Sequence, residues 1–487
     1  MAEPILVGGE WRQGRGAVVP SINPADQSVN AEIATASRED VDDAVAAAAR
    51  AVEDPSWRDL KPHERADYLL RIGALITARA EELAVLQLRD NGKPIHETRA
   101  LVASAAGTFK YYAAACETME GEITPSRGPY LTMSVYEPIG VVAAITPWNS
   151  PIASEAQKMA PALAAGNAVI VKPAEATPLL ALELGRIAEQ AGVPKGVVSI
   201  LPGAGREVGA ALVAHKKVGF VSFTGGTATG RTIAHQAADK LMPVSLELGG
   251  KSPNIVFADA QMDHAINGVL FGIFSSQGQS CIAGSRLFVE ESIHNAFVER
   301  LVERTKALRL GPPLDPKTQM GPQITAEHRD KIAAYVELGR REGGKVLCGG
   351  APPKGEVYDR GFFFQPTILA GLSNSARVCQ EEIFGPVLCV LPFRDEDDLV
   401  AQANDSVYGL ACGIWTESYR RALRVARRIE AGTVWINTYK FFSISTPFGG
   451  VKESGLGREK GRLGIRRYMR QKSLYWGLND TPLPWAD

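Results

Sequence analysis

Apolar runs of strand length alternate with helical patterns through the middle of the chain. From Gly140 onward the runs fall at residues 141–145, 168–172, 197–201, 219–223 and 244–248, and helical segments lie near 154–165, 178–191, 206–215 and 229–240. Such alternation predicts a parallel, doubly wound α/β sheet. Sheets of this kind bind ligands at the carboxyl ends of their strands.

A second strand–helix series follows the first. Its strands are expected at 254–258, 286–290, 387–392, 411–415 and 432–437. This series predicts a second α/β domain, and a ligand pocket is expected in the cleft between the two domains. Two more strand patterns, at 130–136 and 473–477, fall outside both series.

Three helices are expected before the first series. Ser37-Arg38-Glu39-Asp40 has the form of a capping box and predicts a helix start. A long helix is expected over about 64–89, closed by Asn91-Gly92, and another over about 99–116.

Composition narrows the function classes. The length of 487 residues predicts two or three domains. The apolar content of 45% is typical of a soluble globular protein. A net charge of −1 gives no long-range electrostatic attraction to nucleic acid or acidic lipid. Six scattered cysteines without a CxxC pair favour neither disulfides nor a zinc site. The isolated histidines predict no catalytic metal. The first residues lack signal-peptide features, so the cytoplasm is the expected location.

One thiol has a distinctive context. Cys281 lies in Gly278-Gln279-Ser280-Cys281, with Gly284 beyond it, and these glycines are expected to permit a tight turn. A lone cysteine is usually an inert small hydrophobe, whereas a thiolate is a strong nucleophile. Glu247 lies within an apolar strand pattern, where burial raises a carboxyl pKa and makes a general base. Asn149 follows the first strand and offers an amide to an oxyanion.

Glycines near the expected strand ends give weaker signals. Gly203-Ala204-Gly205-Arg206-Glu207-Val208-Gly209 has the wrong last spacing for a dinucleotide fingerprint, so a loop opening a helix is the better interpretation. Gly225-Gly226 follows a strand and opens a helix, whose N-terminal amides can receive a pyrophosphate.

Taken in order, these motifs resemble the aldehyde dehydrogenase superfamily. The resemblance runs from about Trp11 to Trp476 and includes Pro147-Trp148-Asn149, Lys172-Pro173-Ala174-Glu175 and the motif around Glu382. It implies NAD-dependent oxidation of an aldehyde to the carboxylic acid through a cysteine thiohemiacetal and a thioester. Cys281 would be the nucleophile, Asn149 an oxyanion donor and Glu247 the base that activates water, with Lys158 and Glu459 as a proton path behind it.

The same resemblance implies a cofactor site and a substrate site. Gly225 and Gly226 would cap the pyrophosphate, Lys172 and Glu175 would hold the adenosine ribose, and Glu382 with Phe384 would hold the nicotinamide ribose; Trp148 and Leu248 are further expected contacts. A carboxylate at Glu175 repels a 2′-phosphate and favours NAD over NADP. Ser150, Ser154, Gln157, Lys440, Phe442 and Phe448 are expected around the aldehyde. Ser150, Ser154 and Gln157 are small or polar where many family members carry large apolar side chains, which predicts a wide, polar tunnel. Lys440 is expected to attract a carboxylate-bearing semialdehyde.

The implied architecture has three parts. Residues 1–118 and 139–249 would form a Rossmann-like NAD-binding domain, 250–453 the catalytic domain, and 119–138 with 468–487 a β element for oligomerisation, giving a dimer or a tetramer. Two alternatives stay open, a coenzyme A-acylating relative and a catalytically silent structural protein. Glu247 weighs against the first alternative, and the set of Cys281, Glu247 and Asn149 against the second.

Overall fold

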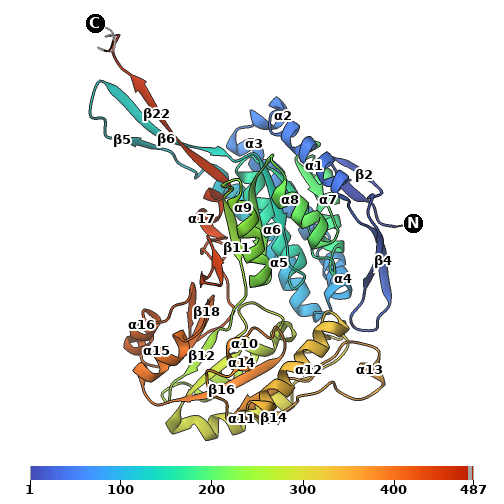
Figure 1. Ribbon diagram of the computed structural model, residues 1–487, viewed down its shortest axis with the longest axis vertical. Helices are drawn as coiled ribbons and strands as arrows, with labels where there is room; N and C mark the ends of the chain where they lie inside the picture. The colour runs from blue at the N-terminus through green and yellow to red at the C-terminus, as the bar shows by residue number, and fades with distance from the viewer. Residues whose placement is uncertain (1, 481–484, 486–487) are drawn as a thin grey trace.

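The computed structural model describes residues 2–480 and 485. Two α/β lobes lie one above the other, and a long β arm extends from the upper one (Figure 1). We call them the first lobe, which holds the eight-stranded sheet, and the second lobe, which holds the seven-stranded sheet; the arm is the three-stranded sheet. The mixed α/β architecture predicted from the sequence is confirmed.

The first lobe is built around a mostly parallel sheet. Its strands, in spatial order, are β2 (Glu10–Arg12), β1 (Ile5–Val7), β9 (Val198–Ile200), β8 (Ala168–Lys172), β7 (Val141–Ile145), β10 (Val218–Thr224), β11 (Val244–Glu247) and β21 (Gly455–Leu456). Every residue of β7 and β8 is buried, which explains their continuous apolar runs. The sequence predicts both strands residue for residue.

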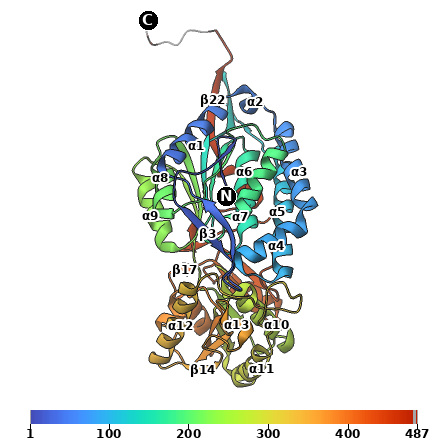
Figure 2. The same cartoon turned by 90° about the vertical axis from the view of Figure 1, so that its right-hand side faces the viewer.

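Helices cover both faces of this sheet (Figure 2). On one face lie α3 (Pro62–Ala78), α4 (Ala80–Asn91), α5 (Ile95–Cys116), α6 (Pro151–Ala164) and α7 (Leu179–Gln190). On the other lie α1 (Arg38–Ala51), α8 (Ala210–Ala214) and α9 (Thr227–Ala238). The short helices α2 (Pro55–Arg58) and η1 (Gly205–Gly209), with the β3–β4 hairpin (Val18–Ile22, Val29–Ala34), complete this part of the chain.

The N-terminal helices confirm one expectation and correct two. Ser37 caps α1, because its hydroxyl accepts from the Asp40 amide while the Asp40 carboxylate accepts from the Ser37 amide. The expectation of a single helix over 64–89 is wrong. The chain leaves helical geometry at Arg79 (φ −106°, ψ 20°), so two helices, α3 and α4, form instead. The Arg79 guanidinium pairs with Glu183 on α7 at 2.6 Å. Helix α5 begins at Ile95, before the expected start.

The second lobe contains the other sheet. Its order is β14 (Lys345–Cys348), β15 (Thr367–Ala370), β16 (Val387–Phe393), β13 (Arg286–Glu290), β12 (Pro253–Val256), β18 (Ala411–Trp415) and β19 (Thr433–Ile436). The helices are α10 (Met262–Phe274), η2 (Ser275–Gly278), η3 (Glu291–Ile293), α11 (His294–Lys306), α12 (Ala326–Arg341), α13 (Glu356–Asp359), α14 (Arg377–Gln380), α15 (Glu396–Asn404) and α16 (Tyr419–Ala426). Strands β14 and β15 were not expected from the sequence.

The arm is formed by β5 (Glu122–Thr124), β6 (Tyr130–Pro138) and β22 (Met469–Gly477). Strands β6 and β22 pair antiparallel from Tyr130 opposite Gly477 to Pro138 opposite Met469, so both exceed their predicted lengths. The end of the expected 468–487 element, beyond residue 480 apart from Trp485, lies outside the described residues. The remaining elements are helix α17 (Gly461–Arg466) and the β17–β20 pair (Tyr408–Gly409, Val451–Lys452). Within the described part of the chain, no helix is both long and apolar enough to cross a membrane.

Candidate active site

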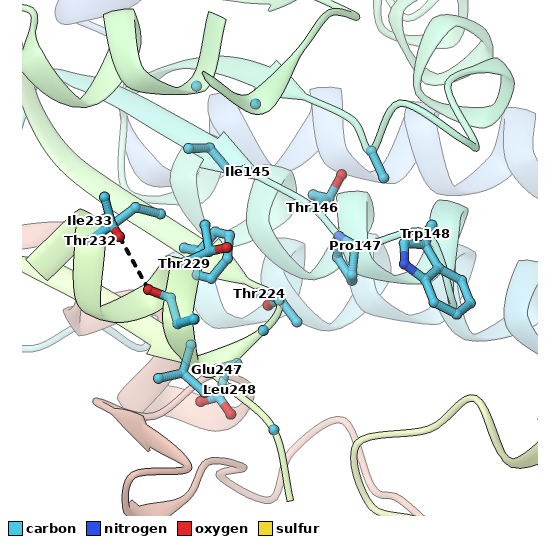
Figure 3. Close-up of a pocket in the computed structure, with 18 of the residues that line it drawn as sticks. Ile145, Thr146, Pro147, Trp148, Thr224, Thr229, Thr232, Ile233, Glu247 and Leu248 are labelled. Carbon is cyan, nitrogen blue, oxygen red and sulfur yellow. Dashed lines mark hydrogen bonds between the residues drawn. The ribbon is translucent and has the colours of Figure 1, made fainter. Parts of the chain in front are cut away.

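A cavity of about 870 Å³ collects most of the expected site residues. Its walls come from the carboxyl ends of β7, β8, β10 and β11, the start of α9 and the segment that carries Cys281. Figure 3 shows Thr146, Pro147 and Trp148 to one side, Thr229, Thr232 and Ile233 to the other, and Glu247 with Leu248 below Thr224. The cavity therefore joins residues of both lobes.

The Cys281 segment has an unusual backbone. Ser276, Gln277 and Gly278 have φ angles of 57°, 55° and 72°, three successive residues in the left-handed region. Such conformations cost free energy in residues other than glycine, so neighbouring contacts must hold them. At Gly278 a Cβ would lie 2.2 Å from the carbonyl carbon of Gly385, which leaves no room for a side chain. Gly284 instead packs closely against Tyr439 and Asn254, so the expectation that it forms part of the turn is wrong.

Residues of the first lobe fasten this segment. The Ser276 amide and hydroxyl donate to Glu97 of α5, at 2.8 and 3.0 Å. The Gln277 side chain donates to the carbonyl of Gly92, at 2.8 Å. These bonds offset the strained backbone and position the thiol that follows it.

Cys281 is the one partly exposed cysteine among the six, and the other five are buried. Burial, together with the charges of Glu382 and Glu247, raises the pKa of the Cys281 thiol to about 12, while Lys440 opposes the rise. The thiol is therefore protonated at neutral pH in the protein without ligands, and its proton has to leave as the nucleophile forms.

Asn149 lies at the same cavity as the thiol. Its side-chain amide donates one hydrogen bond to the carbonyl of Gln279, at 3.1 Å. A primary amide carries two N–H groups, so this bond orients the side chain and leaves the second donor available. An amide held in advance in this way is suited to receive an oxyanion next to Cys281.

Glu247 ends strand β11 and is buried. Both carboxylate oxygens lack a hydrogen-bond partner among the described residues. Burial raises the pKa of this carboxyl well above its ordinary value, the charge of Glu459 adds to the rise, and Lys158 opposes it. A buried carboxyl with unpaired oxygens at a cavity wall is suited to proton transfer.

Lys158 and Glu459 form a buried ion pair behind Glu247. Ser222 donates to the same Glu459 oxygen and accepts from the Lys158 ammonium at 3.0 Å, while the Gln157 amide donates to the other Glu459 oxygen. Gln157, expected at the tunnel wall, thus forms part of this network. A backbone bridge between Phe448 and Glu459 connects the network to the neighbouring loop.

The other end of the cavity presents the residues expected around an adenosine ribose. Glu175 accepts a hydrogen bond from the Gly205 amide, at 2.7 Å. The Lys172 ammonium donates to the Pro173 carbonyl, at 2.9 Å, and burial lowers its pKa to about 8. Gly205, Arg206 and Gly209 also line the cavity. The 203–209 segment therefore opens a helix, as expected, and also contributes to the cavity wall.

The helix α9 starts at the cavity. Gly226 is the N-cap of α9, and a Cβ at this position would meet open space. A Cβ at Gly225 would instead lie 2.4 Å from the Phe223 ring and overlap it. Glu382 accepts from the Gly250 amide at 2.9 Å, and burial raises the pKa of this carboxyl to about 7. Trp148, Leu248, Glu382 and Phe384 all line the cavity, and the Trp148 and Phe384 rings meet edge to face. The backbone amides at the start of α9 can receive the pyrophosphate of a dinucleotide, and Gly226 leaves room for it. The carboxylates of Glu175 and Glu382 can accept hydrogen bonds from ribose hydroxyl groups.

The expected substrate residues are not among those that line the 870 Å³ cavity. Phe442 and Phe448 meet edge to face with their centroids 5.3 Å apart, and Gly449, next to Phe448, packs against Glu247. Lys440 turns elsewhere, since its ammonium donates to the Ser275 hydroxyl at 2.8 Å. Ser150 precedes the first turn of α6 and Ser154 lies within that turn.

Two residues escaped the sequence analysis. His328 lines the cavity, and its Nε2 donates to the Phe384 carbonyl at 2.7 Å, since a carbonyl oxygen can only accept. Burial lowers the pKa of His328 to about 4. Lys460 places its ammonium over the rings of Phe442 and Phe448. The sequence feature that could have pointed to Lys460 is its position directly after Glu459, an expected site residue.

Comparisons with known proteins agree with this geometry. The sequence profile of the aldehyde dehydrogenase family matches residues 11–474. The chain is 42% identical over 487 residues to a betaine aldehyde dehydrogenase of Bacillus subtilis (strain 168), which covers 100% of this chain and 99% of that protein. For a betaine aldehyde dehydrogenase of Mesorhizobium japonicum the identity is 43% over 472 residues, 97% of this chain and 96% of that protein.

A solved structure gives the same result in three dimensions. The betaine aldehyde dehydrogenase of Staphylococcus aureus, in complex with NAD⁺, superimposes with a TM-score of 0.98 at 38% identity, over 100% of this chain and 96% of that one. The family profile spans both lobes and the arm, including the Cys281 segment and Glu247. The chain therefore belongs to the aldehyde dehydrogenase family.

Proposed function

We propose that the protein oxidises an aldehyde to the carboxylic acid with NAD: aldehyde, NAD⁺ and water give acid, NADH and a proton. The observation that carries this proposal is that Cys281, Asn149 and Glu247 lie at one cavity whose other end holds Lys172, Glu175 and the start of α9. NAD, when bound, supplies the acceptor for a hydride. The relatives named betaine aldehyde dehydrogenases support a polar aldehyde as substrate.

Each catalytic residue has one task in this proposal. The Cys281 sulfur bonds to the aldehyde carbon as the thiol loses its proton, and the new oxyanion accepts hydrogen bonds from the Asn149 amide and the Cys281 N–H. Loss of hydride leaves a thioester on Cys281. Glu247 takes a proton from water as the water oxygen attacks the thioester; the C–S bond breaks, the Cys281 sulfur regains a proton to restore the thiol, and the acid leaves. Lys158 and Glu459 pass that proton away from Glu247.

The test is an aldehyde panel with NAD or NADP, with and without coenzyme A. Turnover with NAD alone and free acid as product would support the proposal. A strict requirement for coenzyme A with an acyl-thioester product would establish the acylating alternative. No turnover of any aldehyde, despite NAD binding, would establish the silent alternative.

Replacing Glu175 by glutamine should raise the use of NADP. The carboxylate lies at the expected adenosine end of the cavity, where a 2′-phosphate would meet a like charge, and glutamine keeps an oxygen for the Gly205 amide. We expect the ratio of kcat/KM for NADP to that for NAD to rise about tenfold, or roughly 1.4 kcal/mol. An unchanged ratio would remove Glu175 from cofactor selection. Glu207→Gln, on the neighbouring turn, is the control.

The arm supports an assembly of two or four subunits. Tyr475 and Trp476 of β22 are 73% and 66% exposed, and the short outer strand β5 is exposed throughout. Exposed strand edges with large apolar side chains are typical of strand pairing between chains. Light scattering should give two or four times the chain mass of 52.2 kDa, and a monomer would contradict the proposal.

We retain the division into 1–118 with 139–249, 250–453, and 119–138 with 468–487 as part of the proposal, since the two lobes and the arm correspond to it. Limited proteolysis that cuts first near the arm strands would support it. The cytoplasmic location remains a prediction, and cell fractionation tests it.

A further inference from the structure

The ammonium group of Lys460 has no hydrogen-bond or ion-pair partner in the described part of the chain and lies against two aromatic rings. It lies 3.9 Å from the centroid of the Phe442 ring and 5.5 Å from that of Phe448. Among the described residues it makes no hydrogen bond and no ion pair of its own. The side chain is only partly exposed, so solvent compensates the charge incompletely.

The acidic groups near Lys460 are already engaged. Glu459 is the adjacent residue, but its two oxygens bond to Lys158, Ser222 and Gln157. Burial raises the pKa of Glu247 well above its ordinary value, so its charged form is disfavoured. The Lys460 ammonium therefore lies near Cys281 and Glu247, and the described residues provide it with no ion-pair partner.

Lys440, the residue expected to attract an anion, is in the opposite situation. Its ammonium donates to the Ser275 hydroxyl, at 2.8 Å, and Glu97 lies near enough to raise its pKa against the effect of burial. The charge of Lys440 thus serves to attach its loop to the start of the Cys281 segment. Of these two lysines, Lys460 is the one whose ammonium makes no hydrogen bond or ion pair with any residue that the structure describes.

The position of Lys460 also bears on cationic substrates. Aromatic rings recognise a trimethylammonium group through their faces. Here an ammonium already covers a face of Phe442, and the edges of Trp435 and Phe448 pack around the same ring. A second cation at this place would meet both a like charge and an occupied face.

We propose that Lys460 selects the substrate by pairing with a carboxylate at the far end of the aldehyde, so that the physiological substrate is an anionic semialdehyde and not a quaternary ammonium aldehyde. The inference rests on the proposed function and names its substrate class. Phe442 and Phe448 hold the ammonium from one side, and the carboxylate of the substrate supplies its missing partner. A charge-assisted hydrogen bond of this kind is among the stronger polar contacts.

The test compares ω-oxo acids of about four to six carbons with their ω-amides, which differ only in charge, and with betaine aldehyde. We expect the wild type to prefer the best acid over its amide by roughly 10- to 100-fold in kcat/KM, and to use betaine aldehyde poorly. Lys460→Met should lose most of this preference and Lys460→Arg should keep it. Lys440→Met is the matched control and should leave the preference unchanged. Thermal unfolding with and without NAD checks that each variant folds.

The outcomes separate the two proposals. Turnover of neutral aldehydes with an acid-to-amide ratio that is equal in wild type and Lys460→Met overturns the inference and leaves the proposed function intact. Equal losses on acid and amide also overturn it, because Lys460 would then act on Cys281 or Glu247 instead of on the substrate. Absence of any aldehyde turnover overturns the proposed function itself.

The pH dependence of the preference is a second readout. Burial lowers the pKa of Lys460 to about 8, and the neighbouring Glu459 carboxylate opposes this effect. The ammonium loses its charge as pH rises through this value, so the wild-type preference for the acid should fall above about pH 8. In Lys460→Arg it should persist, because guanidinium stays charged. A preference with the same pH profile in both proteins would contradict the assignment.

Discussion

Replacing Cys281 by alanine should abolish aldehyde-dependent NADH formation, with kcat falling by at least about 10⁴-fold. The fall should be large because Cys281 is the one partly exposed thiol among the six and lies at the cavity that holds Asn149 and Glu247. The variant lacks a nucleophile, so neither the thiohemiacetal nor the thioester can form. NADH absorbance under saturating aldehyde measures the effect.

Two controls define this result. Cys348→Ala, at a thiol buried in the second lobe, should keep activity near that of the wild type. Thermal stabilisation of Cys281→Ala by NAD should show that the fold and the cofactor site remain. Activity of Cys281→Ala above about a tenth of the wild-type value would refute cysteine catalysis.

Replacing Glu247 by glutamine should stop the reaction after its first half. Steady-state kcat should fall by about 10²- to 10⁴-fold, the usual contribution of a general base. Rapid mixing should still give a burst of about one NADH per subunit, because Cys281 and Asn149 are intact. Mass spectrometry of the quenched enzyme should then find the acyl group on Cys281.

The raised pKa of Glu247 adds a pH dependence. Glu247 accepts a proton only when ionised, so the steady-state rate of the wild type should rise with pH through its raised pKa, and the slow rate of Glu247→Gln should lack this rise. Glu299→Gln, at an exposed position of α11, is the control. Loss of the burst together with turnover would contradict a role confined to hydrolysis.

Continuous apolar runs explain why the sheet centres were predictable. Strands β7, β8, β13 and β18 are buried almost throughout, so each is a short apolar segment bounded by polar residues or glycine. Edge strands such as β14 are partly exposed and lack this pattern. At the helix break, Arg79 pairs with Glu183, which is distant in sequence. No local pattern encodes such a contact.

The site likewise contains residues that the sequence predicts and residues whose contacts arise only in the folded structure. Asn149, Glu247 and Cys281 stand in recognisable motifs at strand ends or glycine turns, and the structure brings them to one cavity. Lys460 follows a glutamate near a basic surface stretch and resembles an ordinary exposed lysine until Phe442 is placed beside it. The bond from Lys440 to Ser275 is likewise a product of tertiary structure.

The strained segment before Cys281 has a consequence for modularity. Its fastening points, Glu97 and Gly92, belong to the first lobe, while the thiol itself lies in the segment that leads into the second. A chimera that joins the first lobe of one relative to the second lobe of another would separate the thiol from its anchors. An active chimera should therefore require that the α4–α5 region and the Cys281 segment come from the same parent protein.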